Sequence, residues 1–211
     1  MIVLELTASQ LDNVWPEEPQ HCRRRWWARA VRKLPTISKH SSCFGDVAHA
    51  VVARWLRADD QGLDGQGEQV DLYPPGWLDG RDRFGNPTGT LAPREGALIQ
   101  KLVETAVNSG VPLREPGRRV EVPFDYMVEL GGDRQVRIHG FKDLQVGEEE
   151  VVDFKFVSKR KYVLGPKRLA RDPQFLTYAL SLFKDNPELE ECTVRVVGFV
   201  KDPADPQIIP R

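Results

Sequence analysis

The sequence predicts a mixed α/β protein with its elements in the order helix, three strands, helix, strand. An amphipathic helical pattern covers 45–56, three β-type runs lie between 118 and 156, and a second helix and a last strand lie between 172 and 200. Helices repeat apolar residues three and four positions apart, whereas strands are rich in β-branched and aromatic residues. Segments of both kinds, in this order, predict helices packed on a sheet.

Length and composition predict one domain over 1–211, because a chain of 211 residues can bury one sizeable core. The formal charge of −1 argues against a protein that coats nucleic acid through an overall positive charge. No apolar run approaches the ~20 residues of a membrane span, and the first residues lack the basic start of a signal peptide. Three widely spaced cysteines are typical of reduced thiols, so we expect a cytoplasmic protein.

The first part of the chain predicts two short helices. One begins near Ser9, and the other covers 22–31, where basic residues alternate with aromatic ones. Such a pattern can bind single-stranded nucleic acid, and Arg24 is a candidate contact. The alternative is that the apolar residues pack in the core and the arginines are solvated. We favour this alternative, because most amphipathic helices bury their apolar face.

The helix over 45–56 has a clear buried stripe, with His49 near its margin. A single histidine in this position is usually a hydrogen-bonded core residue, but a neutral imidazole is also a ready metal ligand. The segment 59–93 is rich in glycine and proline, and we interpret it as an insertion, a candidate flap over a groove. A helix is predicted to begin at Pro93 and to end at 108–110.

Three strands follow, over 118–130, 135–141 and 151–156. Residues two apart in a strand share a face, so Asp153 and Lys155 should lie side by side while Phe154 points away. Asp143 follows the second strand closely and can approach Asp153 if the two strands pair. Two neighbouring carboxylates predict a divalent metal ion between them, whereas spacing alone favours an exposed ion pair at a strand edge.

A dense basic cluster comes directly after the third strand. Asp172 and Pro173 then predict a helix start, and Gln174 and Tyr178 should be neighbours on that helix. A last strand is predicted over 193–200, followed by a proline-containing tail over 202–211 without regular structure. Basic runs are usually solvated, but beside a metal site they could contact a phosphate backbone. The candidate contacts are Lys159, Lys161, Lys167, Arg168 and Arg171.

Together these features resemble the PD-(D/E)XK nuclease superfamily, and more narrowly its RecB-like branch. The resemblance spans 9–200 apart from the insertion, and it implies a restriction-endonuclease-like core with the order αβββαβ. That core is a central mixed sheet of about four strands flanked by helices, with additional N-terminal helices. The matching positions are Ser9 and 22–27, Gly45 and His49, Glu121, Gly140 and Asp143, Asp153 and Lys155, and Gln174 and Tyr178.

The resemblance implies a metal-dependent DNA nuclease, most simply an exonuclease acting on linear or single-stranded DNA ends in recombination, repair or phage replication. Mg²⁺ or Mn²⁺ would be held by His49, Asp143, Asp153 and the main-chain carbonyl of Phe154. Lys155, Gln174 and Tyr178 would complete the catalytic set, with Glu121 as a possible accessory residue. A prokaryotic or phage setting is expected. An endonuclease, a non-catalytic nucleic-acid-binding subunit and an unrelated hydrolase with a structural ion remain alternatives.

Two features of related nucleases are not expected here. An iron–sulfur cluster needs four thiolates and the chain has three cysteines, so we predict no cluster. The chain also lacks a Walker-type phosphate-binding motif, so the nuclease would work alone or with a separate motor protein.

Overall fold

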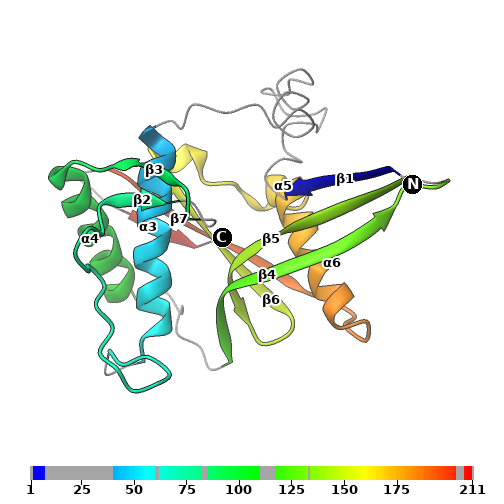
Figure 1. The fold of residues 1–211 in the computed structure, drawn as a ribbon, viewed down its shortest axis with the longest axis horizontal. Coiled ribbons are helices and arrows are strands. Elements are labelled where there is room, and N and C mark those ends of the chain that lie inside the picture. The colour runs from blue at the N-terminus through cyan, green and yellow to red at the C-terminus, as the bar shows by residue number, and fades with distance from the viewer. Residues whose placement is uncertain are drawn as a thin grey trace. The chain divides into compact units, whose positions relative to one another are not determined.

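We describe a computed structural model of the chain, shown in Figure 1. It describes residues 2–7, 40–59, 62–81, 85–109, 117–132, 134–202 and 207–210. The two helices predicted before residue 32, together with the candidate contact Arg24, lie outside these residues. No helix in the described part of the chain is long and apolar enough to cross a membrane.

Six of the described strands form a sheet with the order β1-β5-β6-β7-β8, in which β4 also pairs with β5. The sheet is mixed because β1 runs parallel to β5, whereas the pairs β5–β6 and β7–β8 are antiparallel. The mixed α/β prediction is therefore confirmed, although about four strands were expected. The strands are β1 (Ile2–Thr7), β4 (Arg118–Glu129), β5 (Arg134–Val146), β6 (Glu150–Val157), β7 (Thr193–Val200) and β8 (Gln207–Pro210).

The described residues group into two compact units, and each unit is made of separate stretches of the chain. The first takes its residues from Met1–Thr36, Glu121–Val152 and Gly165–Val194. The second takes them from Ile37–Val120, Asp153–Leu164 and Arg195–Arg211. The prediction that residues 1–211 form one domain stays a prediction.

In the first unit, α6 (Pro173–Asp185) packs against β4. The rings of Phe124 and Tyr178 meet edge to face with centroids 5.8 Å apart, and the hydroxyl of Tyr126 donates to the Thr177 carbonyl oxygen at 3.2 Å. The predicted helix start is confirmed, because the Asp172 side chain accepts from the Gln174 backbone N–H at 2.9 Å. A short helix, α5 (Pro166–Leu169), precedes it.

The β5–β6 hairpin differs from the prediction in one respect. β5 was expected to end at Phe141, but it continues to Val146, and the turn lies at 147–149. Asp143 is therefore inside the strand rather than just beyond it. The charged residues Lys142 and Asp143 hid this continuation because buried charges are rare in strands, yet both side chains are buried.

In the second unit, α3 (His40–Arg57) contacts α4 (Pro93–Asn108) and the hairpin formed by β2 (Asp79–Arg81) and β3 (Pro87–Thr90). The helix start at Pro93 and its end near 108 are confirmed. The described part of 59–93 contains this hairpin and a β-bridge between Leu63 and Gln69. Its role as an insertion or a flap over a groove stays a prediction.

The C-terminal tail is also partly regular, so this expectation was wrong. Gln207–Pro210 forms β8, which pairs antiparallel with β7. β8 is at the end of the described strand order, and proline is tolerated in such an edge strand although it has no backbone N–H.

Candidate active site

Asp153 and Lys155 form an ion pair on β6, with 3.1 Å between Lys155 Nζ and Asp153 Oδ2. The Asp153 side chain is 2% exposed and that of Lys155 is 33% exposed. Phe154 points away and meets Phe199 edge to face at 6.0 Å between centroids, as strand alternation requires. The predicted pairing of Asp153 with Lys155 is therefore confirmed.

The competing interpretation, an exposed ion pair at a strand edge, is wrong. β6 lies between β5 and β7 in the sheet, and the Asp153 side chain is buried. A buried carboxylate loses most of its hydration, so it is retained only where cations or hydrogen-bond donors compensate it. Lys155 supplies part of that compensation from within the same unit.

His49 lies on α3 in the second unit and is half-buried. Its ring meets the ring of Phe156 edge to face, with 5.1 Å between centroids, and Phe156 stacks on Phe199 at 4.6 Å. This is the packing contact that a core histidine makes. Its role as a metal ligand stays a prediction.

Asp143 lies on β5 in the first unit and is 4% exposed. Its neighbour Lys142 is fully buried and places its Nζ 3.2 Å from Oδ2 of Asp185, at the end of α6. Gly140 allows this part of β5 to lie directly beneath Phe124, because a Cβ at Gly140 would be 2.9 Å from the Phe124 ring. Gly140 therefore has a packing role that its place in a motif did not reveal.

Gln174 and Tyr178 are neighbours on α6, as predicted. Gln174 Nε2 donates to the Tyr178 hydroxyl at 2.7 Å. The Tyr178 side chain is 2% exposed, and its ring contacts Phe124 and Phe175. The core therefore holds the ring in place while the hydroxyl makes a polar contact. Their role at a phosphate stays a prediction.

Glu121 on β4 has a φ of 52°, in the left-handed region that non-glycine residues rarely occupy. Such backbone strain persists where the surrounding structure over-determines it. No sequence pattern indicated this conformation, because glutamate has no preference for it. Its accessory role stays a prediction.

The predicted phosphate contacts are all exposed. Lys159 and Lys161 lie in the second unit, on either side of Arg160, at the 3-10 helix η2 (Arg160–Tyr162). The first unit carries the others, Lys167, Arg168 and Arg171, at α5 and the turn after it. The prediction did not include Arg160 or Tyr162, and Tyr162 is 54% exposed, with Lys161 Nζ 5.4 Å from its ring centroid. An aromatic residue inside a basic run was the available signal.

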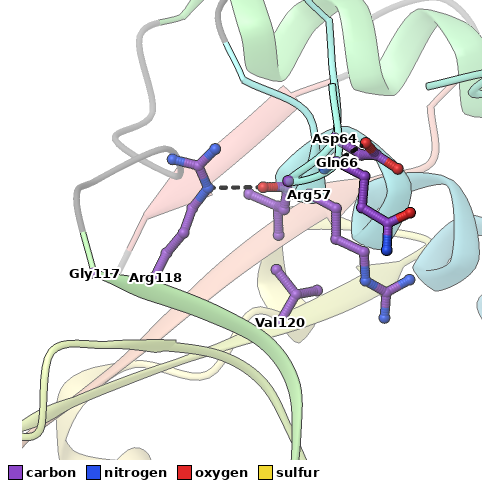
Figure 2. Close-up of a pocket in the computed structure, with 8 residues that line it drawn as sticks. Arg57, Asp64, Gln66, Gly117, Arg118 and Val120 are labelled. Carbon is purple, nitrogen blue, oxygen red and sulfur yellow. Dashed lines mark hydrogen bonds between the residues drawn. The ribbon is translucent and has the colours of Figure 1, made fainter. Parts of the chain in front are cut away.

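A separate open cavity of about 620 Å³ in the second unit contains none of the predicted catalytic residues. Arg118 donates from Nε to the Leu56 carbonyl oxygen at 2.7 Å and from Nη2 to the Ala58 carbonyl oxygen at 2.9 Å. Figure 2 shows the first of these bonds as a dashed line. Arg118 therefore satisfies carbonyl groups at the C-terminal end of α3, which is a structural role. The cavity is lined by Leu56, Arg57, Asp64, Gly65, Gln66, Gly117, Arg118 and Val120.

The comparisons with known proteins decide the family. The sequence model of the PD-(D/E)XK nuclease superfamily matches residues 15–205. The chain belongs to the PD-(D/E)XK nuclease superfamily. This membership supports a nuclease function, and it confirms the resemblance at the level of the superfamily. No curated protein matches the chain in sequence.

Two solved structures are similar to this superfamily member. The crystal structure named "Putative exonuclease", from Eubacterium rectale, has a TM-score of 0.58 and 11% sequence identity, covering 98% of this chain and 72% of that chain. At this identity the likeness shows a shared fold. The structure of SSO0001 has a TM-score of 0.34 and 16% identity, covering 55% of this chain and 50% of that chain.

Proposed function

We propose that this nuclease-superfamily chain is a metal-dependent deoxyribonuclease that hydrolyses phosphodiester bonds at DNA ends. The observation that carries the proposal is the buried Asp153 paired with Lys155 on an interior strand, within the region that matches the superfamily. A carboxylate placed next to a lysine on a rigid strand supplies both an oxygen ligand for a cation and a fixed positive charge.

The sequence supports adding Asp143 to this site. Asp143 is 4% exposed on β5 and lies in the region that matches the superfamily. A buried carboxylate is retained where a cation or hydrogen-bond donors compensate it. We infer that Asp143 and Asp153 act together.

The donor chemistry fits a hard divalent cation. Asp143 and Asp153 offer carboxylate oxygens, and the Phe154 main chain and His49 would complete the protein ligands for Mg²⁺ or Mn²⁺. Among the described residues, no three His, Cys, Asp or Glu side chains gather into a ready-made metal cage. Mg²⁺ is usually held by one or two carboxylates together with water and substrate phosphate, so a two-carboxylate site is a suitable one. When bound, the ion would supply Lewis acidity and an activated water.

The remaining residues would position the water and the phosphate and offset negative charge. Lys155, held by Asp153, would orient the attacking water or offset the negative charge that develops on the phosphate. Gln174 would contact a phosphate oxygen, with its amide aligned by the Tyr178 hydroxyl. The exposed cations from Lys159 to Arg171 would hold the DNA backbone, and Glu121 would be accessory.

The test is cleavage of linear duplex DNA by the purified full chain with Mn²⁺ or Mg²⁺. We expect Asp153→Asn, which keeps the volume of the buried side chain, and Lys155→Ala each to lower the rate roughly 100-fold or more. Glu188→Gln, which changes an exposed carboxylate between α6 and β7, is the matched control and should cleave as the wild type does. Melting curves check that every variant is folded. Undiminished cleavage by both site variants would refute the assignment.

Exonuclease action is the preferred form of the proposal, because the fold is shared with a protein named as an exonuclease. Cleavage of linear but not covalently closed circular DNA is the expected result. Cleavage of both would instead favour a structure-specific endonuclease. DNA binding without cleavage under any divalent ion would identify a non-catalytic binding subunit. A shift in melting temperature on chelation, with no nuclease activity, would indicate a structural ion.

A further inference from the structure

The turn at 159–163 combines exposed positive charge with an exposed aromatic ring. Lys159, Arg160 and Lys161 are all exposed, and Tyr162 is 54% exposed. Lys161 Nζ lies 5.4 Å from the centroid of the Tyr162 ring, within the range of a cation–π contact. A tyrosine this exposed contributes little to a core, so packing does not account for its presence here. Its ring surface is available to a ligand.

The turn is firmly attached to the second unit. The Tyr162 backbone N–H donates to the Lys159 carbonyl oxygen at 2.9 Å, and the Val163 N–H donates to the Arg160 carbonyl oxygen at 3.1 Å. The Val163 side chain is 8% exposed and packs in a cluster with Val200 and Ile209. A Cβ at Gly198 would lie 2.5 Å from a Val163 methyl group, so Gly198 provides the space into which Val163 fits. Tyr162 is therefore presented from a backbone that is already ordered before any ligand binds.

Arg160 extends this surface into a cavity of about 460 Å³ in the same unit. The polar residues Thr105, Ser109 and Gln207 also line this cavity. The Thr105 hydroxyl donates to the Lys101 carbonyl oxygen and the Ser109 hydroxyl to the Ala106 carbonyl oxygen. Each hydroxyl oxygen therefore keeps acceptor capacity, and the Arg160 guanidinium at the same cavity can bind phosphate.

We propose that Tyr162 is a stacking platform for an unpaired nucleobase and that Lys159, Arg160 and Lys161 hold the adjoining phosphates. This inference rests on the proposed function and adds the substrate class, namely a single-stranded stretch at a DNA end. Bases inside a duplex are already stacked on their neighbours, so an isolated ring selects bases that are free. Stacking tolerates any base, because every base has a π face.

The experiment measures binding of a single-stranded oligonucleotide that carries one fluorescent aminopurine base, to the full chain without divalent metal. Stacking on Tyr162 should quench the fluorescence. We expect Tyr162→Ala to lose the quenching and to weaken binding roughly 5-fold or more. Tyr162→Phe keeps the ring and should bind within about twofold of the wild type. Leu130→Ala removes a side chain with the same 54% exposure from the first unit and serves as the matched control.

Two results would overturn the inference. One is wild-type binding and quenching by Tyr162→Ala, and the other is an equal loss in Tyr162→Phe, which would assign the effect to the hydroxyl. Melting curves separate binding from folding, because an exposed side chain should hardly change the melting temperature. The outcome is independent of the cleavage test. If the chain cleaves DNA but its binding does not depend on Tyr162, only the stacking proposal fails. If its binding depends on Tyr162 but no cleavage occurs, only the nuclease assignment fails.

Discussion

Lys142 and Tyr126 in the first unit have the same chemistry as Lys161 and Tyr162 in the second, but their surroundings are opposite. Lys142 is fully buried beside Asp185, and Tyr126 is 9% exposed with its hydroxyl bonded to the Thr177 carbonyl oxygen. Lys161 and Tyr162 are exposed at the 3-10 turn. Buried polar groups must form hydrogen bonds or ion pairs inside the protein, whereas exposed ones remain available to a partner. The first pair should therefore affect folding, and the second pair should affect binding.

The largest stability effect is expected at Tyr126 in alkaline solution. Burial raises the pKa of Tyr126 to about 12, above its ordinary value of 10. Between pH 10 and about 12 the unfolded chain loses this proton while the folded chain keeps it, so the free energy of unfolding falls as the pH rises. The loss should be roughly 1–3 kcal/mol, measured by urea denaturation across this range. Tyr126→Phe removes the titrating group and should flatten the dependence. An equally steep fall in that variant would contradict the assignment.

A smaller stability effect is expected for the pair of Lys142 and Asp185. Asp185→Ala leaves the buried ammonium without a carboxylate at 3.2 Å, and we expect it to cost about 1–2 kcal/mol, because Asp185 is itself 62% exposed. Lys142→Met keeps much of the volume without the charge, so Asp185→Ala should cost less in that background. Urea denaturation of the four chains in this double-mutant cycle gives the coupling. An identical cost in both backgrounds would show that the pair does not contribute.

The smallest stability effect is expected for the exposed cations. Replacing Lys159, Arg160 and Lys161 together by alanine should change the free energy of unfolding by less than about 0.5 kcal/mol per site. The same variant should reduce the slope of log affinity against log salt for single-stranded DNA by up to about 2, since each phosphate contact contributes about 0.7. Filter binding at several salt concentrations measures this slope. A large loss of stability with an unchanged slope would reverse the contrast between the two regions.

Local patterns in the sequence predicted most of the strands and helices correctly. The Asp172–Pro173 start, the strand alternation of Asp153 and Lys155, and the contact of Gln174 with Tyr178 all follow from spacing of five residues or fewer. Each depends on the geometry of a single element, so one sequence suffices to predict it.

Features that depend on distant parts of the chain were not predicted. β1 pairs with β5 in parallel, with the Leu4 backbone opposite that of Val136, and no short-range pattern indicates such a pairing. The extension of β5 past Phe141 was hidden because Lys142 is charged, and its burial depends on Asp185 from another element. For the same reason, local sequence patterns indicate which residues are candidates for the site. Whether Asp143 and Asp153 act together has to be tested by experiment.

The chain's passage between the two units has a practical consequence. β6 leaves the first unit after Val152 and β7 leaves it after Val194, so each unit is assembled from three separate stretches. No single cut of the gene would yield either unit as one fragment, and a truncated product would expose the broken edge of a strand. Point substitution in the intact polypeptide therefore keeps both units whole while each is examined in turn.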